Sequence, residues 1–165
     1  MTRERPTQVD DEVSQRASGL GDVLDFMRVM WAVDHALQKG SKRMESKLGV
    51  TGPQRLVIRV VGRFPKLSAG KLAELLHLHP STLTGVLRRL EAQALVARTS
   101  DPEDRRRTVL RLTRRGARAS ASTKGTVEGA VAVAFARTGQ HHRAATRRFL
   151  DQLATCLDRE IARTR

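Results

Sequence analysis

Apolar residues follow a helical repeat in two long segments, one near each end of the chain. The first segment starts at Leu20, and its apolar positions recur every three, four or seven residues. This pattern predicts a helix of about 28 residues that ends near Leu48 and Gly49, and a similar pattern predicts a last helix over residues 140–162. The stripes consist of Val23, Phe26, Met30, Val33, Leu37 and Met44 in the first helix, and of Phe149, Leu150, Leu153, Leu157 and Ile161 in the last. Such long stripes need apolar cover, which a partner subunit could supply.

Between these segments the pattern predicts four shorter helices and a β-hairpin. Capping hydroxyl residues mark three helix starts, at Thr51, Ser68 and Thr113, and Ser81 opens the remaining helix. The expected buried face of the second helix consists of Leu56, Val57, Val60 and Val61. The last of the four is expected to run to about residue 137, with Gly125 and Gly129 as weak points. Alternating apolar residues at 94–97 and 108–112 flank a turn with Pro and Asp, which is typical of a hairpin.

The chain carries a large positive charge that is concentrated in its middle. It has 31 Lys and Arg against 17 Asp and Glu, a formal net charge of +14. Residues 66–118 hold 12 basic and 5 acidic residues, a net charge of +7. A charged run alone is most often a solvated face, but an excess of this size favours polyanions such as duplex nucleic acid as partners. Aromatic residues make up only 3%, which disfavours binders that stack single-stranded bases on aromatic rings.

Other function classes lack their usual signatures. The longest apolar run, residues 130–136, is much shorter than the roughly 18 residues of a membrane span, and no secretory signal follows Met1. We therefore expect a cytoplasmic protein. No nucleotide-binding loop, nucleophile elbow or zinc-protease motif appears, so we expect no enzyme activity and no cofactor.

The cysteine and the histidines do not form a pattern typical of a disulfide, redox or metal site. Cys156 is the single cysteine, which excludes an internal disulfide framework and favours a buried structural thiol over a redox sensor. The histidine pairs at 77 and 79 and at 141 and 142 have no third ligand at a useful spacing. We therefore expect no metal site.

The helix after Ser81 and the hairpin together suit duplex DNA. An α-helix fits the major groove, and short polar side chains at its N-terminal end allow close approach to base edges. Candidate groove contacts are Ser81, Thr82, Thr84, Arg88 and Arg89, with Gly85 removing bulk beside them. The hairpin tip carries Arg105, Arg106 and Arg107, which can enter a narrow minor groove where the negative potential is enhanced.

Three segments resemble the MarR family of winged helix-turn-helix transcription regulators. They are residues 78–91 (LHPSTLTGVLRRLE), residues 101–106 (DPEDRR) and residues 112–116 (LTRRG). They are similar to the family's recognition helix, its wing and the entry to its fifth helix. By this resemblance Arg106 is the minor-groove arginine, and Asp104 is the acidic residue that pairs with wing arginines and fixes the tip. Glu103 stands where the family often has Arg.

The resemblance implies a mainly α fold with a small β wing. Residues 51–116 would form the winged helix-turn-helix lobe, and residues 19–50 and 117–165 the dimerisation helices. Residues 1–18 mix charges without apolar periodicity and are expected to be a flexible arm.

The function implied is a homodimeric, nucleoid-associated repressor of transcription that reads a pseudo-palindromic operator and is released by a small molecule. Its half-sites would lie about 10 bp apart. An alternative is an architectural DNA-binding protein without ligand response. A second is an enzyme or helical interaction module with an incidental basic face.

A ligand site is expected where the family forms its pockets, between the dimerisation helices and the DNA-binding lobe. Trp31 and His35 lie one turn apart on the first helix and are candidate contacts for an anionic aromatic effector. The competing interpretation is that Trp31 fills the core or the dimer seam.

Overall fold

The computed structural model describes residues 21–163, and the predicted arm at residues 1–18 lies outside them. The described chain is mainly helical with one two-stranded antiparallel sheet, as predicted. In chain order its elements are α2 (Gly21–Leu48), α3 (Gly52–Arg63), α4 (Ala69–Leu75), α5 (Pro80–Ala92), β1 (Val96–Ser100), β2 (Thr108–Leu112), α6 (Arg114–Ala121), α7 (Val127–Ala136) and α8 (Gln140–Arg163).

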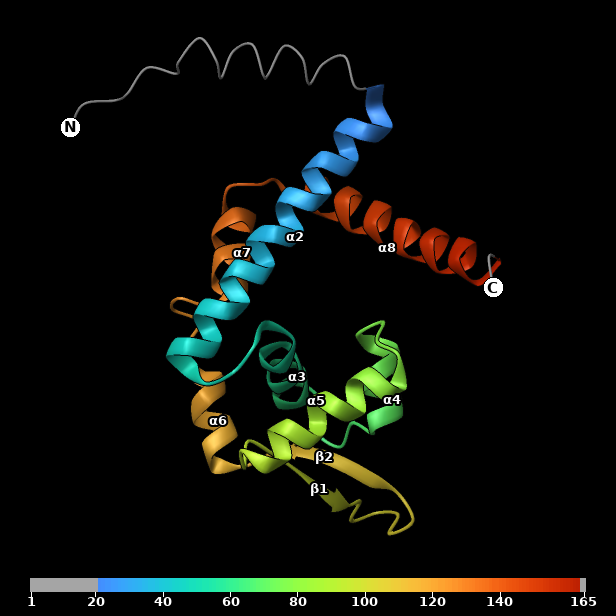
Figure 1. Cartoon of the computed structure of the whole chain (residues 1–165). Helices are drawn as coiled ribbons and strands as arrows, with labels where there is room; N and C mark the ends of the chain where they lie inside the picture. Colours follow the sequence, from blue (N-terminus) through green and yellow to red (C-terminus); the bar gives the residue numbers. More distant parts are fainter. Residues whose placement is uncertain (1–20, 164–165) are drawn as a thin grey trace, which may run out of the picture.

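The hydrophobic core lies in the lobe formed by α3, α4, α5 and the hairpin, below α2 in Figure 1. Leu83, Leu87 and Leu90 of α5 are fully buried at helical spacing against Ile58 of α3 and Leu72 of α4. Each buried side chain of this size stabilises the fold by about 1.5–3 kcal/mol. The core therefore fixes one face of α5 and leaves its other face on the surface.

Three of the four predicted helix starts are confirmed. Thr51 forms a capping box with Gln54, in which each side chain bonds the other residue's backbone N–H. Ser68 and Thr113 cap α4 and α6 through hydroxyl oxygens that accept N–H groups of the first turn. The prediction for α5 was one residue late. Its first residue is Pro80, because proline suits the first turn and the ring of His79 serves as the cap.

The hairpin pairs β1 and β2 in the register from Val96–Leu112 to Ser100–Thr108. Leu67, between α3 and α4, adds a bridge to β2, and the Leu110 N–H donates to the Leu67 carbonyl at 2.9 Å. The wing is thereby held to the helical lobe at its base.

The helix predicted from residue 113 to about 137 is broken in two. Residues 122–126, called the junction here, separate α6 from α7. Gly125 adopts a left-handed conformation (φ +74°), and Thr126 caps α7 by accepting the Gly129 N–H at 3.2 Å. The helix is thus interrupted at the predicted weak point Gly125, whereas Gly129 lies in the first turn of α7.

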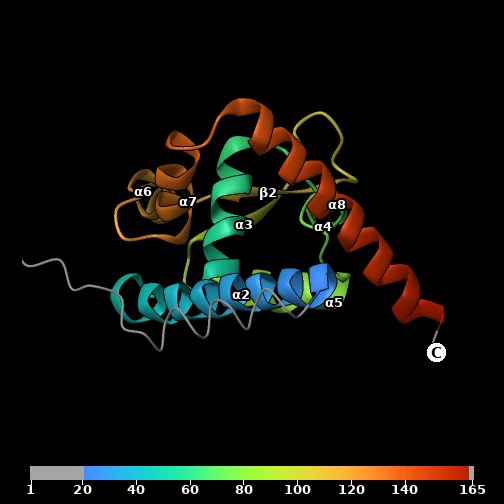
Figure 2. The same cartoon turned by 90° about the horizontal axis from the view of Figure 1, so that it is seen from above.

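The long terminal helices bury little of their apolar surface against the other described residues. Met44 is the buried residue of α2, and neither α7 nor α8 contributes one. Phe26 and Phe149 meet edge to face at 5.1 Å, which joins α2 to α8. In both views the C-terminal end of α8 projects away from the other helices (Figures 1 and 2).

Two burial predictions were wrong. Cys156 is exposed, because its face of α8 has no cover among residues 21–163. Leu56 is 51% exposed, because α3 instead turns Arg55 and Ile58 inward. None of the helices in residues 21–163 is long and apolar enough to cross a membrane.

Candidate nucleic-acid interface

The polar face of α5 lies opposite its buried leucines. All five candidate contacts on this helix are exposed, namely Ser81, Thr82, Thr84, Arg88 and Arg89. Within residues 21–163 neither Arg88 nor Arg89 forms an ion pair. A methyl group added at Gly85 would meet nothing within 4 Å, so this part of the face is open. The structure therefore brings the predicted helix contacts together on one accessible surface.

Local hydrogen bonds fix the N-terminal end of this surface. The Nδ1 atom of His79 accepts the backbone N–H of Ser81 and lies 2.7 Å from its hydroxyl oxygen. The Thr84 hydroxyl donates to the Pro80 carbonyl at 2.8 Å. Both hydroxyl groups keep lone pairs that can accept a hydrogen bond from a base or a backbone group. The end of α5 is therefore rigid and presents acceptors as well as the Thr84 methyl group.

The wing tip is folded by two aspartates. Asp101 is buried, accepts the Glu103 N–H at 3.1 Å and donates its own N–H to the Arg107 carbonyl at 2.8 Å. Asp104 accepts the Arg106 N–H through its carboxylate at 3.0 Å. These bonds shape a tight turn. The expected pairing of Asp104 with wing arginines is not seen among residues 21–163, because its carboxylate bonds the backbone of the tip instead.

The three arginines of the wing point to solvent. Arg105, Arg106 and Arg107 are exposed, and in the described part of the chain none of them has an acidic partner. Glu103 instead pairs with Lys66, the residue between α3 and α4 that has a positive φ of 67°. The departure from the family pattern at Glu103 therefore ties the wing to the helical lobe and leaves the arginine charges free.

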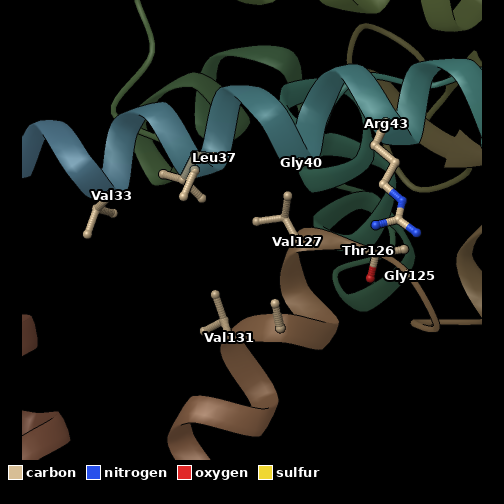
Figure 3. A pocket seen from close by; sticks show the side chains of 10 residues that line it. Val33, Leu37, Gly40, Arg43, Gly125, Thr126, Val127 and Val131 are labelled. Atoms are coloured by element: carbon tan, nitrogen blue, oxygen red, sulfur yellow. The ribbon is translucent and has the colours of Figure 1, made fainter. Parts of the chain in front are cut away.

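A cleft of about 420 Å³ lies between α2 and α7. Val33 and Leu37 of α2 face Val127 and Val131 of α7 across it, and Arg43 lies at one end beside Thr126 (Figure 3). Trp31 and His35, the predicted ligand contacts, are exposed and do not line this cleft.

Arg55, a buried charged residue, was not among the residues predicted to have a role. Arg55 of α3 is 2% exposed and pairs with Glu128 of α7. Its helical spacing to Ile58 and Val61 was a usable signal, because it places Arg55 on the buried face of α3. No group of three His, Cys, Asp or Glu that could hold a metal occurs among the described residues.

Comparison with known proteins finds that the part of the chain that carries this interface is similar to one family. Residues 48–107 match the model of the MarR family. The organic hydroperoxide resistance transcriptional regulator of Bacillus subtilis is 34% identical over 89 residues, which are 54% of this chain and 60% of that protein. The HTH-type transcriptional repressor Rv2887 of Mycobacterium tuberculosis is 28% identical over 137 residues, which are 83% of this chain and 99% of that protein. The chain thus spans less than two thirds of the first relative and nearly all of the second.

Solved structures share the fold. MepR of S. aureus in complex with DNA superposes with a TM-score of 0.64 at 16% identity, over 80% of this chain and 97% of that one. PcaV of Streptomyces coelicolor with its natural ligand gives 0.60 at 23% identity, over 79% and 90%. At these identities the likeness establishes a winged helix-turn-helix fold. The match to the MarR family model covers α3 to the wing, so this lobe is similar to that of the MarR family of transcription regulators.

Proposed function

We propose that this chain is a homodimeric repressor that reads a pseudo-palindromic duplex operator and is released by a small anionic ligand. The observation that carries the proposal is the accessible, charge-unpaired surface formed by α5 and the wing. Its position on the rigid core means that the reading helix needs no rearrangement of its own to meet DNA. Such a protein acts on the bacterial nucleoid.

Each part of the surface has its own task in this proposal. Ser81, Thr82 and Thr84 lie at the end of α5 that enters the major groove, where they contact base edges. Arg88 and Arg89 reach phosphates or guanine from the next turn. Arg106 enters the flanking minor groove, where a guanidinium is attracted by the enhanced negative potential. The shape of the wing turn, set by Asp101 and Asp104, determines how far the arginine reaches.

A second copy of the chain is the proposed cover for the apolar helix faces. Trp31 is 65% exposed on α2, Phe135 is half exposed on α7, and Ile161 is 60% exposed on α8. Exposed apolar surface of this extent is unusual for a monomer and typical of an association surface. We propose residues 19–50 and 117–165 as the dimerisation region and residues 51–116 as the DNA-binding lobe.

The cleft between α2 and α7 is the proposed ligand site. Its walls are apolar, and Arg43 supplies a positive charge at one end, so it suits a molecule with an apolar body and one carboxylate. Trp31 and His35 lie outside the cleft and would contact a ligand only in the assembled dimer.

Selection of bound sites from a random duplex library tests the reading function. We expect a pseudo-palindrome with half-sites about 10 bp apart, bound about 10³-fold more tightly than scrambled DNA. Titration against salt on both duplexes then separates a regulator from an architectural binder. Equal affinities with the same steep salt slope on both would favour the architectural alternative. Absence of duplex binding at low salt would remove the proposal altogether.

Sedimentation of Leu157→Glu tests the dimer. Leu157 is half exposed on the apolar stripe of α8, so the variant should fold but lose self-association. Gln152→Glu, on an exposed polar position of the same helix, is the matched control and should stay dimeric. Thermal-shift and DNA-release assays with benzoate and octanoate test the cleft, and Arg43→Gln should abolish any response. A monomeric wild-type protein would contradict the dimer, and an unchanged response of Arg43→Gln would contradict the cleft.

A further inference from the structure

Arg55 connects three parts of the chain from a buried position. Its Nε atom lies 2.6 Å from a carboxylate oxygen of Glu128, in the first turn of α7. Its two terminal nitrogens donate to the carbonyls of Ala119 and Ser122, which belong to the end of α6 and the start of the junction. One guanidinium therefore holds both sides of the break between α6 and α7.

Hydrogen bonds within the junction also hold it, because the N–H and the hydroxyl of buried Thr126 both donate to the Thr123 carbonyl, at 3.2 and 2.7 Å. No helical hydrogen bonds continue from α6 into α7 across residues 122–126, and Gly125 in the middle has a left-handed φ. Arg59, one turn after Arg55 on α3, adds a bond to the Ser120 carbonyl at 2.7 Å. Two arginines of α3 thus hold the junction from outside, in addition to the hydrogen bonds within it. Hinges form at a few loop or helix-end residues of this kind.

The two sides of the junction belong to different parts of the proposed assembly. α3 packs in the core with α5, so Arg55 is rigidly connected to the reading helix. α7 packs on α2, where the Val127 N–H meets the sulfur of Met44 at 3.3 Å. α2 also packs on α3 directly, where the Gly52 N–H donates to the Ser41 hydroxyl oxygen at 2.8 Å. The Arg55–Glu128 pair is thus a second connection across the boundary between the DNA-binding lobe and the proposed dimerisation helices.

We propose that Arg55 and Glu128 are positioning residues that fix the angle of the DNA-binding lobe on the dimer and thereby set which half-site spacing the protein accepts. The inference rests on the proposed function, because it needs two lobes that bind one duplex. Inserting one base pair moves a half-site by about 3.4 Å along the duplex and turns it by about 35°. A lobe held at a fixed angle cannot follow that movement, whereas a lobe on a loosened junction can.

The experiment compares three proteins on three duplexes. The proteins are the wild type, Glu128→Gln, which removes the charge of the pair and keeps a similar shape, and Glu160→Gln. Glu160 pairs with Arg163 on the exposed surface of α8 and is the matched control. The duplexes are the selected operator, the same operator with one base pair inserted between its half-sites, and a single half-site.

We expect the wild type and Glu160→Gln to prefer the native spacing by at least about tenfold, which corresponds to about 1.4 kcal/mol. Glu128→Gln should lose at least about threefold of that preference while its half-site affinity stays at the wild-type value. A purely structural role would weaken binding to all three duplexes alike. Arg55→Lys keeps the charge but not the fork of donors, and should lose spacing preference in the same direction.

Unchanged spacing preference in a folded, dimeric Glu128→Gln would overturn this inference while leaving the proposed function intact. Equal loss on all three duplexes would also overturn it. A wild-type protein that is monomeric or that shows no operator preference would instead contradict the proposed function, so the two failures are distinguishable. Circular dichroism and sedimentation of each variant at the assay temperature establish that folded dimers are compared.

Discussion

The guanidinium of Arg55 and the carboxylate of Glu128 approach to 2.6 Å although the two residues lie 73 positions apart in the chain. Arg55 is almost fully buried, and a buried guanidinium is tolerated only when it is paired and its remaining donors are bonded. Burial raises the pKa of Glu128. Hydrogen bonds from Arg55, from its own backbone N–H and from Thr126, with the Arg55 charge, outweigh burial and hold the pKa below its usual value of 4.5.

Glu128→Ala should therefore destabilise the protein in a pH-dependent way. At pH 7 we expect its free energy of unfolding to fall by about 1–3 kcal/mol, because a charged donor of Arg55 loses its acceptor. The lowered pKa means that the unfolded chain takes up the proton first. The stabilisation is complete above pH 4.5 and is lost as the pH falls through the folded-state pKa. Urea unfolding of both proteins between pH 7 and pH 3 measures this difference.

The control for that series is Glu160→Ala, which removes an exposed ion pair of α8. We expect it to change the free energy of unfolding by less than about 0.5 kcal/mol at any pH. A difference between wild type and Glu128→Ala that does not shrink below pH 4.5 would contradict the assigned role of the carboxylate charge.

Gly116→Ala should be strongly destabilising. Gly116 belongs to the first turn of α6, and a Cβ atom there would lie 1.9 Å from the backbone carbonyl oxygen of Leu95. The Thr113 hydroxyl donates to the Ala94 carbonyl at 2.6 Å and so holds this turn against the start of the hairpin. The turn and the hairpin therefore cannot easily move apart to make room for the Cβ atom. We expect a loss of at least about 2 kcal/mol in the free energy of unfolding.

Gly70→Ala is the matched control for this clash. Gly70 lies in α4, where an added Cβ meets nothing within 4 Å, so alanine should stabilise the protein by up to about 1 kcal/mol. Thermal or urea unfolding reports both variants. A Gly116→Ala protein as stable as Gly70→Ala would mean that α6 does not pack against Leu95 in this way.

The parts of the fold that could be predicted from the sequence are those that depend on neighbouring residues in the chain. The capping residues Thr51, Ser68 and Thr113 act through bonds to their own first turns, so they were readable without tertiary information. The break between α6 and α7 was not, because the apolar pattern continues through it and the carbonyls freed there are satisfied by Arg55, far away in the chain. The exposure of Leu56 and Cys156 likewise depends on which neighbours cover them.

The same distinction between local and long-range contacts explains which parts of the candidate site could be predicted. The helix and wing contacts lie within two short segments, so a motif could bring them together. The cleft is formed by α2 and α7 from opposite ends of the chain, and its shape depends on how they pack. Trp31 and His35 were chosen from α2 alone, which is why the structure places Val33, Leu37 and Arg43 at the cleft instead.

Gly85→Ala should change stability and DNA affinity in opposite directions. Gly85 is inside α5 and faces open space, so alanine should raise the free energy of unfolding by about 0.5–1 kcal/mol. On the proposed reading face, however, the added methyl group holds the helix away from the bases beside Thr84. We expect operator affinity to fall at least about threefold, or about 0.7 kcal/mol. Wild-type affinity with the same gain in stability would remove this face from the DNA contact.

Arg106→Ala should weaken operator binding by about 1–3 kcal/mol without affecting the fold. Arg106 is exposed and has no acidic partner among residues 21–163, so its loss breaks no ion pair there, and its backbone N–H keeps its bond to Asp104. Because a minor-groove arginine reads groove width, the loss should be greatest on operators whose flanks are A·T-rich. Arg163→Ala, at the exposed end of α8, is the control for a lost positive charge. Equal binding losses for the two variants would show that Arg106 contributes only to the general charge and that the wing does not enter the groove.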